Sequence, residues 1–317
     1  MIKFTLRRTV QAIPLLLLVT VVSFAVMQLT PGGPLTAYEH NPHMTAAQLK
    51  NIEHDLGLDL PPYVQYFKWL SGILHGNWGV SLSTGESVLG MIGEHIGNTL
   101  VLILAAFLIS IALAIPLGIY SAVHKYSFFD YIFTFGSFVA WSAPVFWVGF
   151  MAQLLFSVKL RLLPTAGLYT EGATWTLGDF IKHLIMPALV LGLGSIATWS
   201  RYLRGAMVET LSQDYVRTAK AKGLASHIVV NKHAVRNALI PLITIMALDV
   251  PTYFTGALLV EIVFSWPGMG RLFFDALNAR DYILLQGILL ISAVLIFAGN
   301  LLADLVYGWL DPRIQYS

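Results

Sequence analysis

Residues 217–241 read RTAKAKGLASHIVVNKHAVRNALIP and separate two long apolar runs, 184–202 and 240–263. The stretch holds five Lys and Arg residues, no acidic residue, and a row of small residues that includes Ala219 and Gly223. An apolar run of about 20 residues is long enough to cross a bilayer as a helix. The basic stretch is therefore expected to lie on one side of a membrane, between two helices that cross it.

Apolar runs of this length recur along the chain. Of its 317 residues, 56% are hydrophobic and 11% are charged, whereas about 25% are charged in soluble domains. Six stretches satisfy the length requirement for a membrane-spanning helix. They are residues 9–29, 100–120, 131–157, 184–202, 240–263 and 283–307. We therefore predict an all-α polytopic membrane protein with about six transmembrane helices, the first of them retained because its apolar run is longer than that of a signal peptide.

The distribution of positive charge predicts the topology. If the N-terminus is cytoplasmic, the inner segments hold twelve of the 19 Lys and Arg residues, as the positive-inside rule requires. Both termini and the basic stretch are then cytoplasmic, and residues 30–98 lie outside as a small cap. In that cap, Thr45–Gln48 fits a capping box, Gly57 fits a helix stop, and residues 61–76 fit an amphipathic helix at the outer surface. The predicted regions are 1–29, 30–98 and a core of 99–317 that contains the cytoplasmic loop 203–240.

Polar residues inside the predicted spans are candidates for a transport pathway. Asp249 is deep in its apolar run, where a charge is costly and is expected to face the bundle interior or a water-filled cavity. Thr244, Thr252 and Tyr253 share that run. A structural, hydrogen-bonded carboxylate is the alternative. The prolines of the spans and the segment Gly192–Ser195 indicate kinks and close packing, or else a gate.

Several kinds of chemistry are missing from the sequence. No G-x-x-x-x-G-K-[ST] loop is present, so any ATP must be bound by a partner. His40 and His43 form an H-x-x-H without a matched carboxylate cluster, which favours surface histidines over a metal site. The absence of cysteine excludes disulfides and thiol catalysis, and no Ser, His and Asp grouping has a nucleophile-elbow context. We predict a non-catalytic protein with no metal site and no nucleic-acid partner.

The basic stretch exceeds what topology alone requires. Gly223 can end one short helix and residues 227–238 can form a second, while the small residues allow another surface to approach closely. Basic residues would orient docking electrostatically. The pattern favours a helix-turn-helix docking site for a cytoplasmic protein over an ordinary loop.

A resemblance to a known family follows from this stretch. DYVRTAKAKGL and HAVRNALIP are similar to the EAA loop of binding-protein-dependent ABC importer permeases, in the form found in the peptide branch. Further motifs of that branch occur in order: TPGGP, LGLDLPPYVQYFKWL, GNWGVS, VEIVFSWPGMGRLFFDAL and NLLADLVYGWLDPR. PGGP and GNWG lack the acidic residues of the family's PGDP and GDLG. The whole chain thus resembles the first, B-type membrane subunit of oligopeptide and dipeptide ABC importers.

This resemblance implies a type I ABC importer fold, with a cap between helices 1 and 2 and a coupling helix, around Ala219 to His227, between helices 4 and 5. It implies a bacterial inner-membrane permease that works with a homologous second permease, two cytoplasmic ATPases carrying ATP and Mg, and an external substrate-binding protein or lipoprotein. The implied coupling residues are Arg217, Ala219, Lys220, Gly223, Leu224, Ala225, Ser226, His227 and His233.

The expected pathway or gate residues are Asp249, Thr244, Thr252, Tyr253, Glu261 and Trp266, the last two because they match an outer-facing family motif. The expected substrates are di- or oligopeptides, with nickel chelates or glutathione as alternatives. Functions of other classes are an ion-coupled secondary transporter that uses Asp249, and a membrane scaffold whose basic loop binds anionic lipid.

Overall fold

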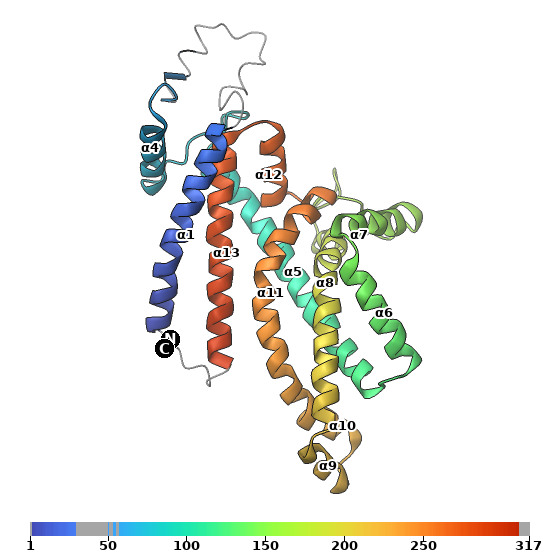
Figure 1. Cartoon of the computed structure of the whole chain (residues 1–317). Coiled ribbons are helices and arrows are strands. Elements are labelled where there is room, and N and C mark those ends of the chain that lie inside the picture. The colour runs from blue at the N-terminus through green and yellow to red at the C-terminus, as the bar shows by residue number, and fades with distance from the viewer. Residues whose placement is uncertain (1, 30–49, 51–52, 55–56, 311–317) are drawn as a thin grey trace. The chain divides into compact units, whose positions relative to one another are not determined.

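The computed structural model describes residues 2–29, 50, 53–54 and 57–310, with side chains described from residue 5 to residue 305 of these ranges. The predicted capping box and the His40–His43 pair lie outside the described residues. The described elements are α1 (Ile2–Leu29), α4 (Pro62–Leu74), α5 (Val88–Val123), α6 (Phe128–Ser142), α7 (Val145–Ala152), the π-helical η2 (Gln153–Lys159), α8 (Leu177–Leu211), α9 (Asp214–Ala221), α10 (Ser226–Ile228), the π-helical η3 (Val229–Val235), α11 (Arg236–Val263), α12 (Met269–Asn278) and α13 (Tyr282–Leu310) (Figure 1).

Long apolar helices dominate the structure, as the sequence predicts. Within the described residues, five helices are long and apolar enough to cross a membrane: α1, α5, α8, the continuous stretch from α10 through α11, and α13. The third predicted span, residues 131–157, is different. It consists of α6 and of α7 continued by η2, and these two helices meet at an angle of 110°. The predicted number of six is reached when this bent pair is counted as one span.

The bend between α6 and α7 corrects the prediction of a single helix over residues 131–157. Pro144 lacks an N–H group, and its ring disfavours the helical conformation for the residue before it. Ala143 accordingly adopts an extended conformation with ψ 132°, and Pro144 caps α7. The 15 residues of α6 reach roughly 22 Å, less than the bilayer core of about 30 Å. Neither helix of the pair therefore has the length of a full span.

The chain forms two compact units, residues 1–99 with 267–298 and residues 100–266 with 299–317. In the first unit, α4 begins at Pro62 directly after Pro61, so the helix predicted within residues 61–76 is confirmed, and it lies against α1. Tyr66 shares a hydrogen bond of 2.9 Å with Thr20 of α1, and Gln28 donates one of 2.7 Å to Gln65 of α4. The first unit also holds a core made by the start of α5, α12 and the start of α13.

A buried carboxylate organises the first turn of α13 in the same unit. Asp281 is fully buried and accepts hydrogen bonds from the backbone N–H of Leu284 at 3.1 Å and of Ser83 at 3.2 Å. The hydroxyls of Ser81 and Ser83 donate to it as well. Asp281 therefore caps α13 and fixes the turn that precedes α5.

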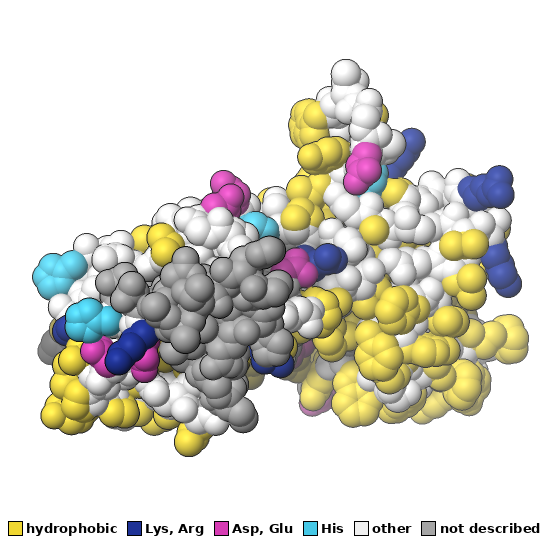
Figure 2. All heavy atoms as spheres, turned by 90° about the horizontal axis from the view of Figure 1, so that it is seen from above, with side chains coloured by type: hydrophobic (Ala, Val, Ile, Leu, Met, Phe, Trp, Pro, Cys, Tyr) yellow, Lys and Arg dark blue, Asp and Glu magenta, His cyan; other side chains and the backbone are white. Residues whose placement is uncertain are grey.

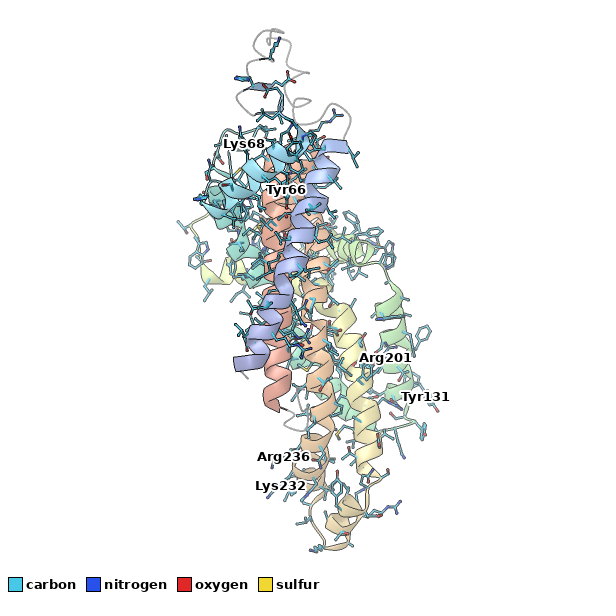
Figure 3. The ribbon with its side chains drawn as sticks, turned by 60° about the vertical axis from the view of Figure 1, so that its left-hand side comes forward. Tyr66, Lys68, Tyr131, Arg201, Lys232 and Arg236 are labelled. Carbon is cyan, nitrogen blue, oxygen red and sulfur yellow. The ribbon has the colours of Figure 1, made fainter. Side chains whose placement is uncertain are left out.

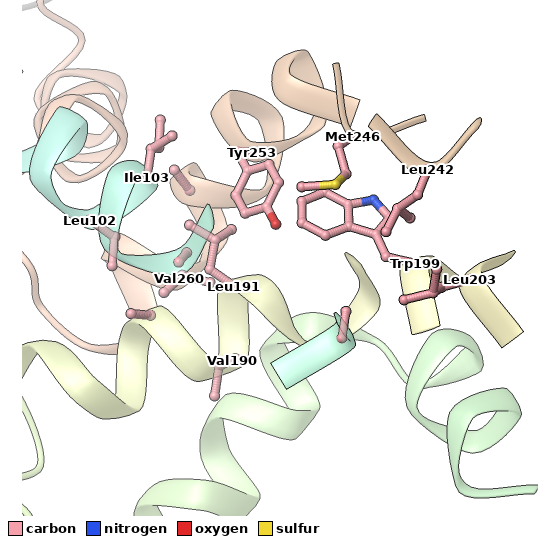
Figure 4. Close-up of a cluster of buried hydrophobic side chains, with 14 of the residues drawn as sticks. Leu102, Ile103, Val190, Leu191, Trp199, Leu203, Leu242, Met246, Tyr253 and Val260 are labelled. Atoms are coloured by element: carbon pink, nitrogen blue, oxygen red, sulfur yellow. The ribbon is translucent and has the colours of Figure 1, made fainter. Parts of the chain in front are cut away.

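The second unit is centred on α8 and α11, which pack side by side along much of their length (Figure 1). Figure 4 shows the cluster between them and α5, in which the rings of Trp199 and Tyr253 are almost completely buried. The ring of Phe107 lies edge-on to both, at centroid distances of 5.5 and 5.9 Å. Hydrophobic side chains also gather on the molecular surface (Figure 2), for example Tyr131 and Phe135 of α6. Such an exposed apolar surface is expected where a protein faces lipid or a membrane partner.

Candidate functional site

A cleft in the second unit is the first part of the candidate site. It has a volume of about 390 Å³ and is lined by the α6–α7 bend, the middle of α8 and the middle of α11. Its polar lining comes from Ser195 and Thr198 of α8 and from Asp249, Thr252 and Tyr253 of α11. Of the expected pathway residues, the structure thus brings Asp249, Thr252 and Tyr253 together in one cleft.

Asp249 is held in this cleft by a residue 50 positions away. The indole Nε1–H of Trp199 donates a hydrogen bond of 2.6 Å to Oδ2 of Asp249. Trp199 is fully buried, so it fixes the position of a carboxylate that is itself only half-buried. Among the described residues that line the cleft there is no Lys or Arg, and Asp249 is their one carboxylate. The cleft therefore offers a single carboxyl group to an incoming cationic group.

The remaining expected pathway residues lie elsewhere. Thr244 is half-buried on α11 outside the lining of the cleft. Glu261 and Trp266 are fully buried at the C-terminal end of α11. The backbone N–H of Trp266 donates a hydrogen bond of 2.9 Å to the backbone carbonyl of Glu261. The ring of Trp266 packs against Phe180 of α8 at 5.9 Å. A gating role for these three residues stays a prediction.

Two glycines of α8 have different surroundings although they are two residues apart. A Cβ at Gly192 would lie 2.4 Å from the Ser110 Oγ and 3.0 Å from the Ala106 carbonyl oxygen, both on α5. A Cβ at Gly194 would have no atom within 4 Å, and Gly194 lines the cleft. The segment 192–195 thus serves close packing on one side and an open cleft on the other, and α8 passes through it as a continuous helix.

The basic stretch forms a helix, a turn and a second helix at the end of α8 and α11 (Figure 1). The first helix, α9, ends at Ala221, because Gly223 takes up the left-handed conformation with φ +74° and its N–H donates to the Lys220 carbonyl at 3.0 Å. The predictions that Gly223 ends a first short helix and that residues 227–238 are helical are confirmed. The expected coupling helix over residues 219–227 is wrong as a single helix, because these residues contain the turn, and the second helix continues without a break into α11.

The surface of this loop is basic with apolar residues between the charges. Ala219 is buried with Val216 and Val229 in a small core inside the loop, so it does not contribute to the exposed surface. His233 is half-buried. The other expected coupling residues are exposed, namely Arg217, Lys220, Gly223, Leu224, Ala225, Ser226 and His227. Lys232 and Arg236 add positive charge nearby (Figure 3).

Two exposed apolar side chains of the loop, Tyr215 and Ile228, were not among the residues expected from the sequence, whereas Leu224 was. Tyr215, Leu224 and Ile228 are all exposed, and the Tyr215 hydroxyl accepts a hydrogen bond of 2.9 Å from Asn237 of α11. Tyr215 and Ile228 lie next to buried residues in short helices. The helical periodicity of the sequence could therefore have indicated that these two side chains face outward. Apolar anchors surrounded by charge are typical of protein-docking surfaces.

An ion pair fastens α6 to α8 between the cleft and the loop. The guanidinium of Arg204 donates two hydrogen bonds of 2.6 Å to the buried carboxylate of Asp130. Asp130 also accepts hydrogen bonds from the hydroxyl of Ser121 and from the backbone N–H of Tyr126. Tyr126 has a positive φ of 65°. One turn away, the Arg201 guanidinium lies 4.4 Å from the centre of the Phe138 ring. The Arg204–Asp130 pair could not be predicted from the sequence, because its members are 74 residues apart.

Comparison with known proteins places the chain in a family. The model of the binding-protein-dependent transport system inner membrane component matches residues 114–316, and the model of the N-terminal part of such components matches residues 1–114. The chain is 41% identical to the oligopeptide transport system permease protein AppB of Bacillus subtilis and 35% identical to the dipeptide transport system permease protein DppB of Escherichia coli. It is 38% identical to a di/tripeptide transport system permease protein of Pseudomonas aeruginosa, and each of these matches covers 100% of both chains. This multi-pass membrane protein therefore belongs to the family of binding-protein-dependent transport system inner membrane components.

Proposed function

We propose that the chain is the B-type permease subunit of an ATP-driven importer that brings di- or oligopeptides across the bacterial inner membrane. The observation that carries the proposal is its similarity, at 35 to 41% identity over full length, to permeases named for oligopeptide, dipeptide and di/tripeptide transport. Two features of the second unit, the cleft and the basic loop, are proposed to be its half of the pathway and its ATPase docking site.

The cleft is proposed to be this chain's half of the translocation pathway. Hydroxyl groups of Ser195, Thr198 and Thr252 can exchange hydrogen bonds with the backbone of a peptide in any sequence. The carboxylate of Asp249 can pair with the α-ammonium group that every unmodified peptide carries, while Trp199 holds the carboxylate in position. A homologous second permease would close the pathway from the other side.

The loop from α9 to α10 is proposed to be the site at which a cytoplasmic ATPase docks. Its exposed basic side chains would steer the approach, and Tyr215, Leu224 and Ile228 would be buried in the contact. In this arrangement both termini are cytoplasmic, two ATPase subunits bind and hydrolyse ATP with Mg, and an external binding protein delivers the peptide. The chain itself performs no catalysis.

The test is ATP-driven uptake of a labelled dipeptide by proteoliposomes that contain the chain and its co-purified partners. Gly223→Arg should reduce uptake and peptide-stimulated ATPase activity at least about tenfold, because it places a long side chain on the docking surface. Gly85→Arg is the matched control, since Gly85 also has a positive φ, of 75°, and open space around its Cβ. Gly223→Asn is a second control, because Asn tolerates the left-handed conformation.

The outcomes separate the candidate functions. Loss of transport in Gly223→Arg with normal transport in both controls supports docking at the loop. ATP-driven uptake of a nickel chelate or of glutathione, without peptide uptake, would refute the assignment of peptides as substrates but not the importer function. Uptake that needs an ion gradient and no ATPase would refute the importer and favour an ion-coupled transporter.

A further inference from the structure

A second pocket lies in the first unit, between α1, α4 and the start of α13. Its volume is about 300 Å³. Most of its wall is apolar and aromatic, with Phe24 and Met27 from α1, Trp69 from α4, Trp78 from the following loop and Ile283 from α13. Nothing in the proposed transport function uses this pocket.

One buried polar group faces the pocket without a partner. Gln286 is 3% exposed, and its side-chain Nε2 has no hydrogen-bond acceptor. The neighbouring amide of Gln65 is fully used, because it donates to the carbonyls of Leu58 and Leu60 and accepts from Gln28. A buried donor without an acceptor is uncommon and destabilising, which indicates that the pocket normally contains an acceptor.

Water is a poor occupant for this pocket. The volume corresponds to about ten water molecules, and a buried water needs two to four polar partners. Apart from Lys68 and Asn77, which are exposed, the polar side chains of the wall are Gln65, whose amide is fully used, and Gln286, whose Nε2 has no acceptor. An amphiphile with an apolar chain and a carbonyl oxygen fits this wall better.

The position of the pocket indicates which amphiphile it takes. Aromatic residues such as Trp69 and Trp78 are typical of the membrane interface, and α4 exposes Tyr63 and Phe67 as an interfacial helix would. Lys68 of α4 is the one charged residue among those described around the pocket, and Figure 3 shows it on α4 next to Tyr66. A lysine at the interface is a suitable partner for a phosphate group.

Helix α4 is only partly covered by its contacts with α1. It has no buried residue along Pro62–Leu74, although it presents an aromatic face to α1 through ring contacts of 5.5 and 6.1 Å with Phe24. A chain inserted between α1, α4 and α13 would supply the missing apolar contacts and hold α4 in place.

We propose that this pocket binds one phospholipid molecule. Its acyl chain lies against the Phe24, Trp69 and Trp78 rings, its ester carbonyl accepts a hydrogen bond from Gln286 Nε2, and its phosphate is paired with Lys68. The lipid is a structural ligand that docks α4 on α1.

The experiment uses the full importer complex with Phe24→p-benzoylphenylalanine, photo-crosslinked in native membranes and again after repeated detergent washing, with mass spectrometry of the adducts. Leu18→p-benzoylphenylalanine is the control, because Leu18 lies on the same helix and is 58% exposed. We expect a phospholipid adduct at position 24 that survives washing, while the adduct at position 18 disappears. If the variant at position 24 does not assemble, Trp69→p-benzoylphenylalanine provides the same readout.

Two further substitutions test the assigned contacts. Gln286→Leu should reduce the wash-resistant adduct about tenfold, because the carbonyl loses its donor. Lys68→Gln should remove the preference for a phospholipid over added diacylglycerol. Adducts with detergent alone, an adduct with a partner polypeptide, or an undiminished lipid adduct in Gln286→Leu would each overturn the proposal.

Discussion

The close crossing of α5 and α8 allows one prediction to be worked out quantitatively. In Gly192→Ala the new Cβ would lie 2.4 Å from the Ser110 Oγ and 3.0 Å from the carbonyl oxygen of Ala106. The hydroxyl must then move. It currently donates to Ala106 O at 2.7 Å or Gly192 O at 3.2 Å and accepts from the Tyr253 hydroxyl at 3.0 Å. The backbone oxygen cannot move without shifting α5 as a whole.

The expected destabilisation follows from three contributions. Overpacking by one methyl group costs about 1–3 kcal/mol. Each interhelical hydrogen bond that is lost inside a membrane bundle costs about 0.6 kcal/mol. Replacing a helical glycine by alanine returns about 0.5–1 kcal/mol. Gly192→Ala should therefore lower the free energy of unfolding of this unit by about 1–3 kcal/mol, which is a factor of roughly 5 to 150 in the opening equilibrium.

The absence of cysteine from the chain provides the assay. Ser200→Cys is a conservative replacement at a fully buried position of α8, so the labelling rate of its thiol reports opening of the bundle. Labelling should accelerate about 5- to 150-fold in the Gly192→Ala background and should not accelerate with Gly194→Ala, which meets no atom within 4 Å. Adding Ser110→Ala should slow the labelling of Gly192→Ala, because it removes one of the two clashes. Equal labelling rates for Gly192→Ala and Gly194→Ala would refute the close-packing argument.

Three further predictions concern buried or cleft carboxylates. Arg204→Gln leaves the Asp130 carboxylate buried without its charged partner, so we expect a loss of about 3–5 kcal/mol in stability; thermal unfolding of the purified complex measures it, and a further Asp130→Asn should recover part of the loss. Asp249→Asn keeps an acceptor for Trp199 but removes the charge. Uptake of a free dipeptide should therefore fall about tenfold more than uptake of the same dipeptide with an acetylated N-terminus. An equal decrease for both peptides would contradict recognition of the ammonium group. Asp281→Ala removes the cap of α13 at a cost of about 0.5–2 kcal/mol, which limited proteolysis should detect as faster cleavage in the turn before α5, and unchanged cleavage would argue against the capping role.

The membrane spans could be predicted from the sequence because bilayer thickness sets a length that apolar runs must match. The bend at Pro144 could not, since Pro116, Pro187 and Pro251 look the same in sequence and lie inside continuous helices. The difference between Pro144 and the other three prolines lies in their tertiary contacts. A Cβ at Gly149 of α7 would lie 3.0 Å from the Val263 side chain, so α7 packs closely on the end of α11, and this contact fixes the direction of α7 after the bend.

The candidate site shows the same division between local and long-range information. Asp249 stood out because a carboxylate in an apolar run is rare. Its partner Trp199 did not, because a tryptophan in an apolar run is ordinary and the contact spans 50 residues. The basic loop was evident from charge, whereas the burial of Ala219 depends on Val229, which reaches it only after the turn at Gly223.

The continuity of two helices connects the loop to the cleft. α8 runs unbroken from Leu177 to Leu211, and the helical stretch that includes α11 runs from Ser226 to Val263. Both helices line the cleft in their middle, and the loop joins their ends. Because a packed helix pair moves as a unit rather than deforming gradually, a displacement of the loop by a docked partner is expected to change the cleft walls together. The Arg204–Asp130 pair fastens α6 to α8, so the bend that forms the third wall would follow the same movement, and weakening that pair should uncouple the α6 wall before it affects the other two.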